Sequence, residues 1–111
     1  MRIGILLSTS PESQNSYSVY RISQALLAAG HSIRIFLMDD GVYNATVNRS
    51  KKKLFVKMDE LISQGVEIAL CAMSAEMRGI RKEELLSEVG FSSQSELAEI
   101  AKSSDRFLSF G

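Results

Sequence analysis

A helical pattern that ends at a glycine and leads into an apolar run occurs twice in this chain, and it limits the possible folds more than any other feature. Residues 26–30 (L-L-A-A-G) precede the apolar run 32–38, and residues 61–65 (L-I-S-Q-G) precede the apolar run 66–70. Another apolar run, 2–7, stands before the first helical pattern. Strand, helix, strand units in succession favour right-handed crossovers and a parallel sheet. We therefore predict an α/β fold.

The remaining segments extend this pattern over the whole chain, which we expect to form a single domain, 1–111. Val19, Ile22 and Leu26 repeat at helical spacing, and Met73 and Met77 share a helix face, so that both are expected in the core. We predict helices over residues 13–29, 51–65, 72–79, 82–89 and 93–101, and a last strand over 105–110.

Composition excludes several classes of protein. Thirteen basic and thirteen acidic residues cancel, so no overall charge attracts nucleic acid or an acidic membrane. No stretch approaches the roughly 20 apolar residues of a membrane span, and the chain enters a strand pattern without a signal-peptide layout, so we expect a cytoplasmic protein. One cysteine and one histidine provide neither an internal disulfide nor the usual ligands of a zinc site.

The single cysteine, Cys71, follows a buried strand pattern and opens a short helical one. Reactive groups gather beyond the carboxyl ends of parallel strands, and a cysteine pKa falls at a helix N-terminus near basic side chains such as Arg78. This placement predicts an ionised, accessible thiol that acts as a nucleophile. The alternative is a buried cysteine that behaves as a small hydrophobic residue.

Other polar segments are weaker candidates for a site. Ser8 opens the sequence S-T-S-P, whose hydroxyls could bind a ligand, although a polar turn between strand and helix explains it better. Asp39 and Asp40 follow the second strand pattern, where adjacent carboxylates commonly form solvated turns, and Tyr43 lies in the same break. A nucleotide-binding domain is disfavoured because the first loop lacks a glycine-rich phosphate motif.

Three segments give the chain a resemblance to the DsrE/DsrF-like family of small sulfur-relay proteins, most closely its DsrE and TusD branch. The first is the opening strand and long helix that end at Gly30 and His31. The second is D-G-V-Y-N-A at 40–45. The third is C-A-M-S-A-E-M-R-G-I at 71–80, which is similar to the family's active-cysteine segment. The three occur in the family's order in a chain of the right length.

The resemblance implies a three-layer α/β/α sandwich around a mainly parallel sheet of four to five strands. It implies assembly as homotrimers, homohexamers or hetero-oligomers with related subunits, and no cofactor or metal. Cys71 would accept sulfane sulfur as a persulfide, a sulfurtransferase activity, and pass it to a partner protein's cysteine. Arg78 would stabilise the sulfur anion, while Asp40 and Tyr43 would border the crevice. The family also implies an alternative, a non-catalytic binding or assembly subunit with a buried, inert Cys71.

Overall fold

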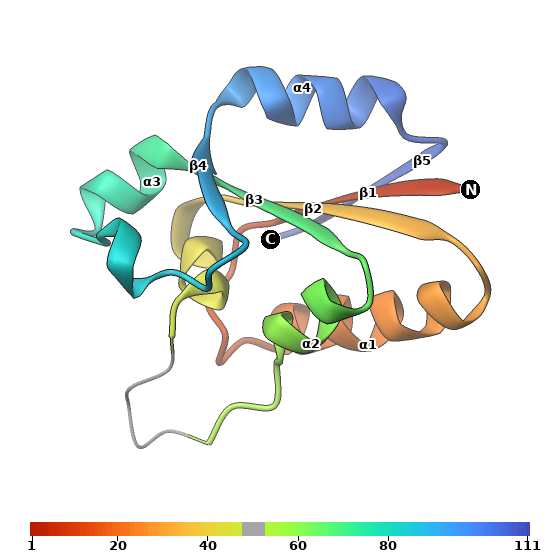
Figure 1. The fold of residues 1–111 in the computed structure, drawn as a ribbon, viewed down its shortest axis with the longest axis horizontal. Coiled ribbons are helices and arrows are strands. Elements are labelled where there is room, and N and C mark those ends of the chain that lie inside the picture. The colour runs from red at the N-terminus through yellow and green to blue at the C-terminus, as the bar shows by residue number, and fades with distance from the viewer. Residues whose placement is uncertain (48–52) are drawn as a thin grey trace.

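The computed structural model describes residues 1–47 and 53–111. Its centre is a five-stranded sheet of order β4-β3-β2-β1-β5 in which every neighbouring pair is parallel. The strands are β1 (Arg2–Leu7), β2 (Ser32–Leu37), β3 (Glu67–Cys71), β4 (Gly90–Ser92) and β5 (Arg106–Phe110). Helices α1 (Gln14–Ala28) and α2 (Met58–Ser63) cover one face, and α4 (Gln94–Ser103) covers the other (Figure 1). The predicted three-layer α/β/α fold is confirmed.

The side chains of each strand alternate between the two faces of the sheet, and this divides the core into two parts. The larger part faces α1 and α2 and includes Ile5, Ile35 and Leu70, all fully buried. The smaller part lies beneath α4 and contains Phe36, Cys71 and Ile100; partly buried apolar side chains of Leu6, Met38, Ala69 and Leu97 pack against it. Successive strand residues point to opposite faces, so Leu70 joins the larger core and Cys71 the smaller.

Helix α1 matches the prediction closely. The side chain of Ser13 caps its N-terminus by accepting a hydrogen bond from the Ser16 amide at 3.1 Å. Beyond its C-terminus, Gly30 adopts φ +89°, a conformation that side-chain-bearing residues rarely take. The turn at Gly30 thus leads the chain from the end of α1 into the start of β2.

Several predicted boundaries are wrong. Helix α2 begins at Met58 rather than near residue 51, and residues 53–57 are irregular; Lys51 and Lys52, at the start of the predicted helix, lie outside the described residues. The predicted helix 82–89 is a single 3-10 turn, η2 (Lys82–Glu84), and it is followed by β4, which was not predicted. The break after β2 is a 3-10 helix, η1 (Asp39–Ala45).

The carboxyl ends of the strands meet at one end of the molecule, where η1 and the short helix α3 (Ala72–Met77) are found (Figure 1). The prediction for the two methionines of α3 is wrong, because Met73 and Met77 are 63% and 76% exposed. Instead, Ser74 and Ala75 form the buried face of this helix. In the part of the chain that the structure describes, no helix combines the length and apolar character needed to cross a bilayer.

Candidate functional site

Cys71 is both the last residue of β3 and the N-cap of α3. Its backbone is still extended, and its sulfur accepts a hydrogen bond from the Ser74 amide, with 3.5 Å between N and Sγ. This is the position of an N-capping side chain, in which sulfur takes the place of the usual oxygen. The predicted location at a strand's carboxyl end and a helix N-terminus is confirmed.

The Cys71 side chain is less accessible than expected. The residue is 3% exposed and packs with Phe36 and Ile100. Gln94, an exposed residue in the first turn of α4, donates a hydrogen bond from Nε2 to Sγ at 3.9 Å. In this conformation the thiol lies beneath a side chain that is itself at the surface.

The environment of the thiol favours its ionised form. Burial raises the pKa of the Cys71 thiol, but hydrogen bonds lower it by more, so this pKa lies below that of an ordinary cysteine. The hydrogen bonds come from the Ser74 side chain, the amides of Ser74 and Met73, and the Gln94 side chain. Donors aimed at a sulfur anion stabilise it relative to the neutral thiol. Gln94 was missed by sequence reasoning, because it comes from a distant segment that only the folded sheet brings to Cys71.

Arg78 lies at the other end of α3 from Cys71. Its Nε is 3.0 Å from Asp40 Oδ1, and its Nη1 donates to the Ser74 carbonyl at 3.0 Å. The amide of Asp39 donates to the Ser74 hydroxyl at 3.0 Å. The structure therefore uses Arg78 and Ser74 to fasten α3 onto η1, which differs from the expected direct role of Arg78 at the sulfur.

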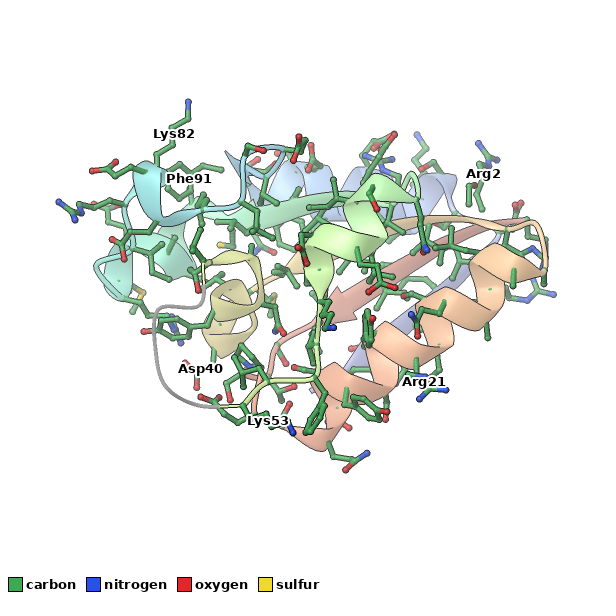
Figure 2. The ribbon with its side chains drawn as sticks, turned by 60° about the horizontal axis from the view of Figure 1, so that its bottom comes forward. Arg2, Arg21, Asp40, Lys53, Lys82 and Phe91 are labelled. Carbon is green, nitrogen blue, oxygen red and sulfur yellow. The ribbon has the colours of Figure 1, made fainter. Side chains whose placement is uncertain are left out.

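Asp40 and Tyr43 border the same cavity, of about 650 Å³, beside η1. The cavity is also lined by the loop after β1 and the segment before α2; Cys71 and Ser8 are not among its lining residues. Figure 2 shows Asp40 on η1 and Lys53 on the segment that leads to α2, at the same end of the molecule. The structure thus places Arg78, Asp40 and Tyr43 around η1, whereas Cys71 lies at the opposite end of α3 from Arg78.

Ser8 serves a different part of the sheet. Its amide and its hydroxyl both donate to the Phe110 carbonyl, at 3.0 and 3.3 Å, and so hold the end of β5 against β1. Sequence reasoning also missed a buried network in which Asn44 donates to the Thr9 carbonyl at 3.0 Å and to the Ser16 hydroxyl at 3.3 Å. This network ties η1 to the loop after β1.

A metal centre is not assembled among residues 1–47 and 53–111, where no three His, Cys, Asp or Glu side chains gather as ligands. The chemistry available at the site is that of a hydrogen-bonded thiol with a lowered pKa at the end of a strand. The thiolate form of such a group is a nucleophile toward sulfur.

The fold and the site define a class of small α/β proteins that place one cysteine at the carboxyl end of a parallel strand, at the start of a short helix. Within this class, the chain belongs to the DsrE/DsrF-like family, whose sequence profile matches residues 1–110.

Two relatives carry names that describe an activity. The sulfurtransferase TusD homolog of Pseudomonas aeruginosa is 30% identical over 128 residues, which cover 100% of this chain and 98% of that protein. Sulfurtransferase TusD of Serratia proteamaculans is 32% identical over 126 residues, with 95% and 96% covered. Among solved structures, the ychN protein of E. coli superposes with a TM-score of 0.84 at 24% identity over 98% of this chain and 97% of that one, which shows a shared fold.

Proposed function

We propose that this chain is a sulfur carrier that accepts sulfane sulfur as a persulfide on Cys71 and passes it to a cysteine of a partner protein. The observation that carries this proposal is the set of hydrogen bonds from α3 and Gln94 that lowers the pKa of the Cys71 thiol. Membership in the DsrE/DsrF-like family and similarity to two proteins named sulfurtransferase TusD support a place in sulfur relay.

The proposed reaction has two displacement steps and no net oxidation. The Cys71 thiolate attacks the outer sulfur of a donor persulfide, so that a new S–S bond forms on Cys71 and the donor leaves as a thiolate. An acceptor thiolate then attacks the outer sulfur on Cys71, takes it as a persulfide and releases the Cys71 thiolate. The amide donors at Sγ stabilise the Cys71 thiolate, which is the nucleophile of the first step and the leaving group of the second.

The donor and the acceptor must be other molecules, because the chain has a single cysteine. We expect both to be proteins of a reducing compartment, the cytoplasm, in which a lone thiol stays free. Nucleic acid is not an expected direct partner. In this proposal Asp40 and Tyr43 contact the partner chain from the rim of their cavity, Arg78 holds Asp40 in place, and Ser8 supports β5.

We also propose assembly into a homo-oligomer, a trimer or hexamer, or a hetero-oligomer with related subunits. Strand β5 supports this, because it lies at the edge of the sheet and pairs with β1 alone. Phe107 and Leu108 on it are 37% and 36% exposed. An unprotected edge strand with apolar side chains is a surface that another chain can cover.

The burial of Cys71 favours a second candidate, an assembly subunit in which the thiol is inert. A cysteine that is 3% exposed and packed against Phe36 and Ile100 fits that role. Alkylation kinetics separate the two functions. A thiol that reacts rapidly near neutral pH belongs to the carrier, and a thiol that reacts only after unfolding belongs to the assembly subunit.

A transfer assay tests the carrier function. The chain is incubated with a low-molecular-weight cysteine persulfide, freed of excess donor, and mixed with glutathione; sulfane sulfur on glutathione is then quantified. We expect sulfur to appear on glutathione in proportion to the wild-type chain and to be absent with Cys71→Ser. Equal transfer by the two chains would exclude Cys71 as the carrier.

A further inference from the structure

The burial of Cys71 sets a requirement for any reaction at its sulfur. A residue that is 3% exposed leaves little of its surface open to a donor in the observed conformation, so a covering group has to move. The Ser74 amide, at 3.5 Å, and the Gln94 side-chain amide, at 3.9 Å, both donate hydrogen bonds to Sγ. The two donors differ in how easily they can move away from the sulfur.

The Ser74 amide is part of the backbone of α3 and is fixed by the helix. The Ser74 hydroxyl also accepts the Asp39 amide, and the Ser74 carbonyl accepts Arg78, so moving this group requires α3 to detach from η1. Gln94 is an exposed side chain at the first position of α4. Rotation of such a side chain takes picoseconds to nanoseconds and disturbs no helix.

We propose that Gln94 is the gate of the Cys71 site: its side chain covers the sulfur and donates to it when closed, and rotates away to admit the donor and the acceptor. This inference rests on the proposed carrier function, to which it adds the control of access. Gln94 acts on the reaction through Cys71 as a positioning residue.

The size of a persulfide supports this assignment. An S–S bond is about 2.05 Å long, so an added sulfur that extends toward α4 enters the space in which Gln94 Nε2 now lies, 3.9 Å from Sγ. The remaining separation is far below an N–H···S contact distance. Loading in that direction therefore displaces the Gln94 side chain, whose amide can then donate to the outer sulfur from a new position.

Two substitutions distinguish the two effects of Gln94, which are the covering of Sγ by its side chain and the hydrogen bond that it donates to Sγ. Gln94→Ala removes both, whereas Gln94→Met keeps a long unbranched side chain and removes the donor. Ser95→Ala, the next exposed position of α4, is the matched control. The alkylation rate of Cys71 is measured as a function of pH with a small reagent, iodoacetamide, and a bulky one, pyrene maleimide. The plateau rate with pyrene maleimide at high pH, where the thiol is fully ionised, reports access once it is divided by the iodoacetamide plateau, which corrects for the change in thiolate nucleophilicity.

We expect Gln94→Ala to raise the plateau rate with pyrene maleimide at least about tenfold, as follows when the open state is a minor population of the wild type. Gln94→Met should leave that plateau near the wild-type value. Both variants should raise the pKa of the thiol, and Ser95→Ala should change neither quantity. A plateau for Gln94→Ala equal to that of the wild type would overturn the gate, and so would an unchanged pKa in both variants.

These readouts use alkylation and do not depend on persulfide chemistry. If the gate behaves as expected but glutathione receives no sulfur, the carrier function fails and the gate stands as a property of the thiol. If sulfur is transferred while the Gln94 variants alkylate like the wild type, the carrier function stands and the gate is rejected.

Discussion

Ser74 links the reactivity of Cys71 to the anchoring of α3, so Ser74→Ala should change both. The hydroxyl of this buried residue accepts the Asp39 amide at 3.0 Å, and it contributes to the lowered pKa of the Cys71 thiol. Alanine is a better helix former and leaves the backbone amide at Sγ in place. The substitution therefore removes the hydroxyl contacts and little else.

The magnitudes follow from these contacts. Losing one hydrogen bond costs about 1 kcal/mol, and Asp39 has a left-handed φ of 50° that this hydrogen bond helps to hold, so the free energy of unfolding should fall by about 1 to 2 kcal/mol. A hydrogen bond to an ionised group is worth more, so the pKa of the thiol should rise and iodoacetamide alkylation near neutral pH should slow about tenfold.

Urea denaturation measures the first quantity, and alkylation across a pH series measures the second. The matched control is Ser63→Ala, which removes a hydroxyl that donates to the Glu60 carbonyl in α2 and should leave the thiol unchanged. A Ser74→Ala variant whose thiol alkylates at the wild-type rate across the whole pH series would refute the argument that this hydroxyl stabilises the thiolate.

Three further predictions concern other parts of the structure. The folded chain lowers the pKa of Cys71 below its value in the unfolded chain, about 8.5. The stability that the ionised thiol adds is therefore fully present above about pH 8.5 and is lost as the pH falls through the pKa of the folded chain. The difference in unfolding free energy between wild type and Cys71→Ala should grow as the pH rises from neutral. Leu108→Lys, on the open edge of the sheet, should lower the mass of the assembly in light scattering while the melting temperature of the fold changes little; an unchanged mass would argue against β5 as the interface. Gly41→Ala should destabilise the chain by about 3 kcal/mol in urea, because a Cβ would overlap the backbone carbonyl of Leu7, whereas Gly90→Ala, with open space around it, should cost less than about 0.5 kcal/mol; similar values for the two would contradict the close packing of η1 on β1.

The repeated order of helix, glycine and strand was sufficient to predict the parallel sheet. Its signals are local: apolar runs long enough to be buried, and glycines such as Gly30 and Gly65 that adopt positive φ between helix and strand. Strand β4 lacked such signals. It spans three residues, its side chains are largely exposed, and its pairing with β3 depends on backbone contacts that sequence periodicity does not contain.

The position of Cys71 was predictable for the same reason, since it follows directly from the end of β3. Its burial was not. The thiol is enclosed by Phe36 from β2 and by Ile100 and Gln94 from α4, and these residues come together only when the sheet forms. Met73 and Met77 were assigned to the core by their spacing, but Ser74 and Ala75 face it, and the Ser74 hydroxyl accepts a hydrogen bond from the Asp39 amide of η1.

The intact mass of the chain after persulfide loading tests the central claim most directly. Wild type and Cys71→Ser are treated with the same cysteine persulfide under native conditions, and their masses are compared before and after a reducing agent is added. We predict that wild type gains one sulfur atom, which the reducing agent removes, and that Cys71→Ser gains none. A wild-type chain that gains no more sulfur than the serine variant would contradict it.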